Sequence, residues 1–308
     1  MEQYYIGFDI GGTKCASCVA QWDNQGIKIL KREEIPTKNS PFDTMDELAP
    51  YVEDWITRYQ VTRAGISCGG PLDSEKGIII STPNLAREWH GFEIVSYIKE
   101  RFKLSAKLEN DANASAVAEW KFGAGKGAKN LVFMTFGTGL GAGLILDGKL
   151  YSGTNGNAGE VGHIRLEQNG PIGFNKAGSA EGFCSGNGIK RLAQIRAQEK
   201  GILIDKDITT KIVFEGARNG DEFYLSVVKE SAEKFARVVS ILIDLFNPEA
   251  IIAGGVFMRN YDLFMPVIAP IIEQESLMDS YKICKILPAK IGENIGDYAA
   301  LAIAVLGD

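Results

Sequence analysis

The stretch best suited to chemistry covers residues 107–114, with the sequence KLENDANA. A short apolar run ends at Leu108, polar residues follow, and an Ala-rich segment begins at Ala112. This pattern predicts a strand that passes directly into a helix, with Asn110 or Asp111 near the N-cap. We expect the field of the helix N-terminus to keep the Asp111 carboxylate ionised, so that it can accept a proton from a substrate hydroxyl. Taken alone, the stretch is better explained by a capping carboxylate, and the rest of the chain reverses that preference.

Two glycine-rich hairpins offer a place for a phosphate chain. In the first, the β-rich run Tyr4–Phe8 ends in DIGGTK at residues 9–14, and another strand follows. In the second, the apolar strand Leu131–Phe136 ends in GTGLGAG at residues 137–143. This loop leads into a strand and not a helix, which argues against a dinucleotide-binding Rossmann loop. Backbone N–H groups at such tips can bind phosphate, and Asp9 could hold Mg²⁺ through water. The repeated unit predicts a duplicated fold that holds a nucleotide phosphate chain between two lobes.

Length and composition are those of a globular protein with two domains. The chain has 308 residues, enough for two domains of roughly 150 residues each. Its net charge of −6 argues against a nucleic-acid-binding surface. No apolar run approaches the roughly 20 residues that span a bilayer, and residues 1–5 lack the features of a signal peptide. The five cysteines are scattered and odd in number. We therefore expect a reduced, cytoplasmic protein that binds neither nucleic acid nor membrane.

The remaining pattern is mixed α/β, with polar residues gathered at strand ends, where ligands bind in such folds. The predicted elements include a turn at 23–26, a helix that begins near Pro41, a strand Ala64–Cys68, a strand Gly77–Ser81, a helix from about Phe92 to Phe102, a long helix from about Asp221 to Phe246, a strand Ala250–Ala253 and an Ala-rich helix Tyr298–Leu306.

Ordered motifs over nearly the whole chain resemble those of the ROK family (repressor, open reading frame, kinase) of bacterial sugar kinases. They are DIGGTK at 9–14, GPL at 70–72, TPNL at 82–85, ENDANA at 109–114, FGTGLG at 136–141, EVGH at 160–163 and AGG at 253–255. The resemblance implies an α/β, actin-like ATPase (ribonuclease H-like) fold, duplicated in two lobes with mixed sheets. We expect an N-terminal lobe of residues 1–112, on which the helix 297–308 packs back, and a C-terminal lobe of residues 113–296.

The resemblance also implies an ATP-dependent kinase that phosphorylates a sugar hydroxyl, most simply O6 of a hexose, with Asp111 as the general base. The residues expected to bind ATP, with Mg²⁺ near Asp9, are Asp9, Gly11, Gly12, Thr13, Lys14, Gly137, Thr138, Gly139, Gly254 and Gly255. The residues expected to bind the sugar are Gly70, Pro71, Asn84, Asn110, Glu160, His163 and Glu181. The family also implies a homodimer.

One departure from the family pattern concerns zinc. Most members carry a motif C-x-C-G-x-x-G-C-x-E after the histidine, and the three cysteine positions here hold Ile172, Phe174 and Ser179. Structural zinc typically takes four thiolate or imidazole ligands, and His163 alone does not supply them, so we expect no structural zinc. The loop 168–188 must then be held by packing, for which Phe174 and Phe183 are the candidates. Glu181 is retained.

Several alternatives remain open at the level of the sequence. Glucose, an N-acylhexosamine such as N-acetylmannosamine, fructose or a β-glucoside are all compatible with the candidate sugar contacts. Repressors of the same family carry an N-terminal helix-turn-helix domain, whereas this chain begins at its first predicted strand and carries a negative charge. A sensor that has lost catalysis would not need both phosphate hairpins and Asp111. We therefore expect an enzyme.

Overall fold

The structure is a computed structural model that describes residues 2–23 and 26–306. The chain forms two compact units, each described here by itself: residues 1–127, 150–158 and 293–308 make the first, and residues 128–149 and 159–292 make the second. The middle of the predicted turn at 23–26 (Asn24 and Gln25) and the last two residues of the predicted helix 297–308 lie outside the described residues. Within the described ranges, no helix is both long enough and apolar enough to cross a membrane.

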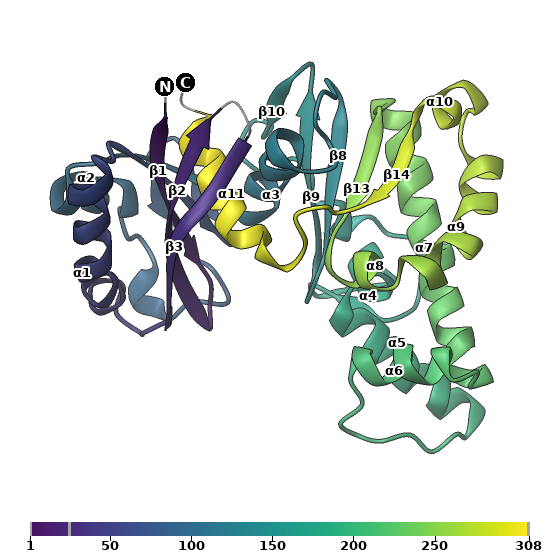
Figure 1. The fold of residues 1–308 in the computed structure, drawn as a ribbon. Helices are drawn as coiled ribbons and strands as arrows, with labels where there is room; N and C mark the ends of the chain where they lie inside the picture. The colour runs from purple at the N-terminus through teal and green to yellow at the C-terminus, as the bar shows by residue number, and fades with distance from the viewer. Residues whose placement is uncertain (1, 24–25, 307–308) are drawn as a thin grey trace. The chain divides into compact units, whose positions relative to one another are not determined.

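The first unit is built on a five-stranded mixed sheet of order β3-β2-β1-β4-β7 (Figure 1). Its strands are β1 (Gln3–Ile10), β2 (Lys14–Asp23), β3 (Gly26–Pro36), β4 (Arg63–Cys68) and β7 (Ser105–Asn110). Strand β1 pairs antiparallel with β2 and parallel with β4, and β4 pairs parallel with β7. The short strands β5 (Leu72–Asp73) and β6 (Ile78–Ile79) and the 3₁₀ turn η1 (Arg87–Trp89) connect β4 to α2. The predicted strand Gly77–Ser81 is shorter than expected and covers only Ile78–Ile79; it begins after Gly77, which adopts a left-handed turn conformation with φ +72°.

Helices cover both faces of this sheet. On one face lie α1 (Pro41–Tyr59) and α2 (Ile94–Phe102), whose apolar side chains join those of β1 in one core. On the other face α11 (Ile295–Val305) packs against β1 and β4, and α3 (Asp111–Phe122) packs against α11 (Figure 1). Because α3 contacts α11, the first unit includes the whole of α3 and runs to Gly127, beyond the boundary expected at residue 112.

The second unit repeats the arrangement with a sheet of order β10-β9-β8-β13-β14. Its strands are β8 (Leu131–Phe136), β9 (Leu140–Leu146), β13 (Ala250–Ala253), β14 (Lys285–Pro288) and the edge strand β10 (Lys149–Tyr151), whose last two residues are counted with the first unit. Strand β8 pairs antiparallel with β9 and parallel with β13, as β1 does with β2 and β4. Two mixed five-stranded sheets with the same strand order confirm the duplicated two-lobe, actin-like fold.

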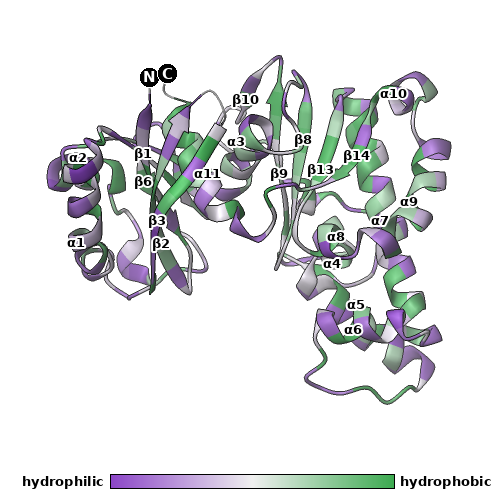
Figure 2. Ribbon diagram, viewed as in Figure 1, coloured by the Kyte–Doolittle hydropathy of each residue, from purple (hydrophilic) through white to green (hydrophobic). Residues whose placement is uncertain are grey.

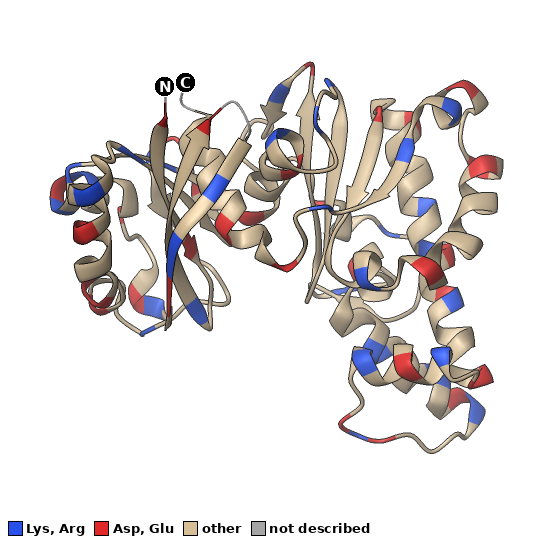
Figure 3. Cartoon of the chain, in the orientation of Figure 1, with Lys and Arg blue, Asp and Glu red and all other residues tan. Residues whose placement is uncertain are grey.

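The helices of the second unit pack chiefly around α7 (Glu222–Phe246). Phe235 of this helix contacts the rings of Phe136, Phe257 and Phe264. Figure 2 shows apolar residues concentrated in β8 and β13, and Figure 3 shows lysine, arginine and acidic residues interspersed mainly over the helices. The other elements are η2 (Val161–His163), the hairpin β11 (Ile172–Gly173) and β12 (Lys176–Ala177), α4 (Ala180–Phe183), α5 (Gly186–Lys200), α6 (Thr210–Arg218), α8 (Gly255–Arg259), α9 (Tyr261–Glu275), α10 (Met278–Ile283) and η3 (Gly292–Asn294).

Candidate active site

Asp111 is the first residue of α3 and follows directly after the last residue of β7. Its neighbour Asn110 is the N-cap: Oδ1 of Asn110 accepts hydrogen bonds from the N–H groups of Ala112 (2.9 Å) and Asn113 (3.4 Å). Oδ1 of Asp111 also accepts from Ala112, at 2.8 Å. Because Asn110 performs the capping role, the second carboxylate oxygen of Asp111 remains available for other chemistry.

The turn that follows β4 lies beside this junction. A Cβ atom built on Gly69 would come 3.9 Å from Oδ2 of Asp111, and one on Gly70 would come 3.3 Å from Nδ2 of Asn110. The carbonyl oxygen of Pro71 accepts hydrogen bonds from the N–H groups of Ile80 and Ser81. Parallel strands β4 and β7 therefore end together, and the turn that carries Gly69 and Gly70 lies beside Asn110 and the predicted base Asp111.

The surroundings of Asp111 shift the pKa of its carboxyl group. Its side chain is accessible to solvent, yet desolvation by the surrounding protein raises the pKa of the carboxyl group above its usual value. The hydrogen bond from the N–H of Ala112 lowers this pKa and only partly offsets the desolvation. Desolvation therefore opposes the ionisation that the helix N-terminus was expected to favour, and it has the larger effect on this pKa.

The first glycine hairpin packs directly against Asn84. The N–H of Gly11 donates to the carbonyl oxygen of Lys14 (3.0 Å), which closes the turn between β1 and β2. A Cβ atom on Gly12 would lie 2.2 Å from the carbonyl oxygen of Asn84. The backbone of the predicted phosphate hairpin therefore touches a predicted sugar contact, at a distance that only glycine allows. Thr13 is exposed at the tip.

Asp9, at the end of β1, lies against the start of α11. A Cβ atom on Gly296 would come 2.1 Å from Oδ2 of Asp9. Burial, followed by the negative charges of Asp297 and Asp111, raises the pKa of Asp9 to about 7, and Arg32 opposes this shift. Arg32 itself donates a hydrogen bond from Nε to Oδ2 of Asp297 at 2.7 Å.

Lys14 does not join this carboxylate group. Its Nζ atom forms an ion pair with Glu34 of β3 at 2.5 Å and is largely exposed. Contact between Lys14 and a phosphate would require this surface pair to open, which is inexpensive for exposed ions.

The carboxylates near Asp9 fit a magnesium ion held largely through water. Mg²⁺ typically keeps several water ligands and takes one or two carboxylates together with substrate phosphates. Asp9 and Asp297 supply oxygen donors of that kind. Among residues 2–23 and 26–306, no three His, Cys, Asp or Glu side chains form a group that could hold a metal ion by themselves.

In the second unit, the side chain of Glu181 contacts the second glycine hairpin. The N–H of Gly137 donates to the carbonyl oxygen of Gly139 (3.1 Å) and closes the turn. Oε2 of Glu181 accepts from the N–H of Leu140 at 3.1 Å, and a Cβ atom on Gly139 would come 2.6 Å from the same oxygen. A Cβ atom on Gly137 would meet no other atom within 4 Å. Gly137 and Thr138, both predicted to contact phosphate, are therefore exposed at this hairpin.

Two further candidates, Gly254 and Gly255, lie close to this hairpin, and Gly162, between the candidates Glu160 and His163, lies beside Glu181. Gly255 has φ +58°, and a Cβ atom there would lie 2.2 Å from the carbonyl oxygen of Phe136. The N–H of Gly254 donates to the carbonyl oxygen of Met134 at 3.0 Å. A Cβ atom on Gly162 would come 3.2 Å from Cβ of Glu181. The structure thus gathers the predicted ATP contacts of this unit around the end of β8 and places the segment with Glu160 and His163 next to Glu181.

The positions that hold cysteine in most ROK proteins have other roles here. Ile172 lies in β11, and Phe174 lies at the tip of the β11–β12 hairpin, where its ring contacts His163. Ser179 caps α4 by accepting a hydrogen bond from the N–H of Gly182 (3.2 Å) and donates to the carbonyl oxygen of Gly173 (3.3 Å). Aliphatic, aromatic and hydroxyl side chains do not suit zinc, so no step is assigned to that metal.

The packing expected to hold the loop 168–188 is only half observed. Phe183 is buried, and its ring would meet a Cβ atom built on Gly170 at 2.6 Å. Phe174 is instead 63% exposed. The loop is also held by hydrogen bonds, including those from Arg165 to the carbonyl oxygen of Ala177 (2.7 Å) and from Lys176 to that of His163 (2.5 Å).

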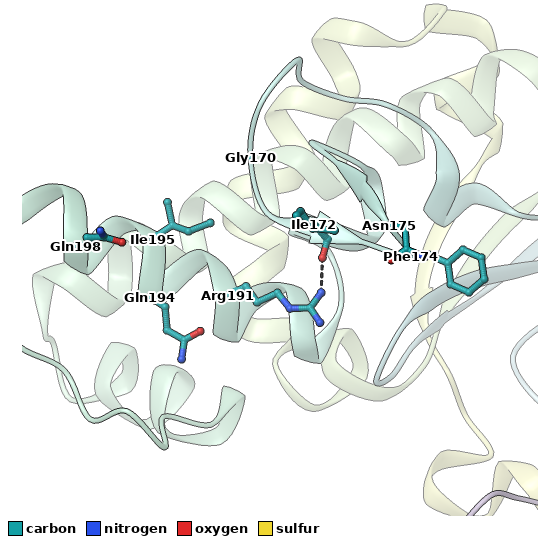
Figure 4. A pocket seen from close by; sticks show the side chains of 8 residues that line it. All are labelled: Gly170, Ile172, Phe174, Asn175, Arg191, Gln194, Ile195 and Gln198. Carbon is teal, nitrogen blue, oxygen red and sulfur yellow. Dashed lines mark hydrogen bonds between the residues drawn. The ribbon is translucent and has the colours of Figure 1, made fainter. Parts of the chain in front are cut away.

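A groove of about 640 Å³ lies between the β11–β12 hairpin and α5 (Figure 4). Its lining residues are Gly170, Ile172, Phe174, Asn175, Arg191, Gln194, Ile195 and Gln198. It contains none of the residues predicted to bind ATP or sugar, so it is not the predicted site.

Sequence reasoning missed two features of the site. Asp297 and Arg32 control the charge around Asp9, and Glu109 accepts hydrogen bonds from Asn113 Nδ2 (3.0 Å) and from its neighbour's N–H (2.9 Å). A usable signal existed for Asp297, because it stands just before an Ala-rich run as Asp111 does. No local sequence pattern marks Arg32, because its partner Asp297 is distant in the chain.

Comparisons with known proteins agree with the resemblance drawn from the sequence motifs. The model of the ROK family matches residues 5–305. A glucokinase from Streptomyces coelicolor is 31% identical, over 97% of this chain and 96% of its own length. The solved structure of a ROK family glucokinase from Streptomyces griseus in complex with glucose and AMPPNP is 30% identical, with a TM-score of 0.78 over 99% of this chain and all of that one. A xylose repressor from Bacillus spizizenii is 28% identical over 94% of this chain and 74% of its own.

Proposed function

Because the chain belongs to the ROK family, we propose that it is a kinase that transfers the γ-phosphoryl group of ATP to a sugar hydroxyl, O6 of a hexose. The observation that carries this proposal is the placement of Asp111. Its carboxylate starts α3 beside the Gly69–Pro71 turn, a neighbouring residue performs the capping role, and its pKa is raised. A raised pKa brings the basicity of a carboxylate closer to neutral pH, where a general base works best.

The proposed reaction balances simply. Asp111 takes the proton of the sugar hydroxyl as that oxygen forms a bond to the γ-phosphorus, and the bond from phosphorus to the β–γ bridging oxygen breaks, which leaves ADP. Alignment of the two reactants supplies most of the rate. The residues proposed to orient the sugar are Gly70, Pro71, Asn84, Asn110, Glu160, His163 and Glu181.

The glycine hairpins are the proposed phosphate contacts. Gly11, Gly12 and Thr13 belong to the first, and Gly137, Thr138 and Gly139 to the second, which has open space at Gly137. Gly254 and Gly255 are proposed to border the adenosine. Mg²⁺, when bound near Asp9, would neutralise part of the negative charge of the phosphates.

The glucokinase relatives favour glucose as the acceptor. The test is ADP release with Mg-ATP over a panel that contains glucose, fructose, N-acetylmannosamine and a β-glucoside. Turnover with glucose well above that with the other sugars is the expected result. Turnover with another sugar would support the kinase activity and identify a substrate other than glucose. A cytoplasmic homodimer is also proposed, and light scattering on the purified protein tests the dimer.

A second candidate is a sugar-binding protein that does not transfer phosphate, which the similarity to a xylose repressor favours. Calorimetric binding of a sugar without any ADP release, over the same panel, would support this candidate and contradict the kinase.

A further inference from the structure

Phe174 touches the side chain of His163 across two separate segments of the second unit. The ring centroids lie 5.0 Å apart and the ring planes cross at 70°, which is an edge-to-face contact. Phe174 and Asn175 form the two-residue loop between the paired residues Gly173 and Lys176. His163 belongs to η2, so the contact connects the hairpin tip to the segment that carries a proposed sugar contact.

Two cationic side chains connect the two strands of the hairpin to neighbouring segments. Nζ of Lys176 donates a hydrogen bond to the carbonyl oxygen of His163 at 2.5 Å. Arg191 of α5 donates to the carbonyl oxygen of Ile172 (Figure 4). The same view shows the ring of Phe174 directed away from Gln194 and Gln198 of α5. With both strands tied to neighbouring elements, the tip has little freedom to move away from the imidazole.

Neither burial nor turn chemistry accounts for phenylalanine at the tip. The side chain is 63% exposed, so it adds little to the core. Phe174 has φ +43° and Asn175 has φ +62°, a pair of left-handed conformations that favours Asn, Asp or Gly at the first position. A bulky residue there is uncommon, and backbone strain of this kind is concentrated at functional sites. The ring of Phe174 therefore contributes chiefly its contact with His163.

We propose that Phe174 is a positioning residue that fixes the imidazole of His163 for a hydrogen bond to a sugar hydroxyl. This inference rests on the proposed function, because the sugar contact of His163 belongs to it. An imidazole offers two different ring nitrogens, and rotation of the ring changes which of them reaches the substrate. Contact with the Phe174 ring restricts that rotation, and the Lys176 hydrogen bond holds the backbone of the same residue.

Two substitutions separate this role from a purely structural one. Phe174→Asn removes the ring and suits the left-handed turn, so it retains the hairpin, and Phe174→Tyr keeps an aromatic ring. We expect the Asn variant to raise the KM for sugar by about 2- to 10-fold, as loss of one hydrogen bond does. Its kcat and its KM for ATP should change by less than about twofold, because the lost contact is one of substrate binding. The Tyr variant should behave as the wild type. An unchanged sugar KM in the Asn variant would overturn the proposal.

A second measurement does not depend on turnover. The chain has only two histidines, so the ring-proton resonances of His163 can be separated by NMR from those of His90, which is exposed in the first unit. A neighbouring aromatic ring shifts such resonances. The proposal predicts that Phe174→Asn moves the His163 signals and leaves His90 unchanged, while Phe174→Tyr largely preserves both. Unmoved His163 signals in the Asn variant would contradict the contact. If the wild type lacked kinase activity on every sugar, the proposed function would be wrong. The NMR measurement would still show whether the ring of Phe174 contacts His163.

Discussion

Arg32 and Asp297 are 265 positions apart in the sequence, and Nε of Arg32 donates a 2.7 Å hydrogen bond to Oδ2 of Asp297. The bond joins β3 to the first turn of α11, next to the point where Gly296 meets Asp9. The Asp297 side chain is 5% exposed and that of Arg32 is 40% exposed. The buried carboxylate of Asp297 is therefore paired with a cation, Arg32, that lies near the surface.

Substitution of Arg32 by methionine should destabilise the protein. It leaves Asp297 buried without its cation, beside a second carboxylate, and removal of one partner of a buried pair is costly. Because Arg32 is partly solvated, we expect a loss of about 1–3 kcal/mol, less than for a fully buried pair. Arg58→Met is the matched control, since Arg58 and Asp54 form an exposed pair at 3.9 Å, and it should change stability by less than about 0.5 kcal/mol. Urea unfolding measures both, and equal effects would contradict the structural role of Arg32.

The raised pKa of Asp9 predicts a pH dependence of stability. The pKa rises from 3.8 to about 7 on folding, so the native state binds more protons than the unfolded state between these values. The contribution of Asp9 to the free energy of unfolding should therefore fall as pH rises from about 4 to about 7 and stay flat above that. Asp9→Asn removes this contribution. Urea unfolding at several pH values should show a smaller decrease for the variant than for the wild type, and parallel profiles would refute the assignment.

Magnesium should act on the same group. A divalent cation favours the ionised carboxylate, so Mg²⁺ binding near Asp9 would offset the repulsion from Asp297 and Asp111. We expect MgCl₂ with ATP to raise the Tm of the wild type more than ATP with EDTA does. The difference should shrink in Asp9→Asn. If the variant responds to the metal as the wild type does, the magnesium site lies elsewhere.

Two glycines of the hairpins should respond to alanine in opposite ways. In Gly12→Ala the new methyl group meets the carbonyl oxygen of Asn84 at 2.2 Å, so one of the two segments must shift. We expect a loss of stability of about 1–3 kcal/mol, as for other overpacked positions. Gly137→Ala meets nothing within 4 Å and should leave stability within about 0.5 kcal/mol, while it raises the KM for ATP by occupying the proposed phosphate position. Equal destabilisation of both variants would contradict the packing of Gly12.

Local patterns predicted the elements that carry the site. Glycine followed by a second β-run marked both hairpins, and the polar break after Leu108 marked the junction at which Asn110 caps α3. Strand Ala250–Ala253 has the predicted limits. These features depend on residues close together in the chain, so periodicity and turn chemistry are sufficient to find them.

The remaining features depend on contacts between distant segments. The pairing of Arg32 with Asp297 requires α11 to lie on the sheet, and the desolvation that raises the pKa of Asp111 comes from tertiary packing. Phe174 was expected to pack within the loop, and it lies exposed against His163 instead. Its left-handed conformation opposes its intrinsic preference, so no local rule predicts it.

The central proposal is that Asp111 removes the proton from the sugar hydroxyl, and Asp111→Asn tests it most directly. The substitution keeps the size of the side chain and its hydrogen-bonding oxygen while it removes the base. ADP release with Mg-ATP and saturating sugar should fall by about 10²- to 10⁴-fold, and sugar affinity measured by calorimetry should stay within a few-fold of the wild type. A variant that turns over sugar at a rate near that of the wild type would show that Asp111 is not the base.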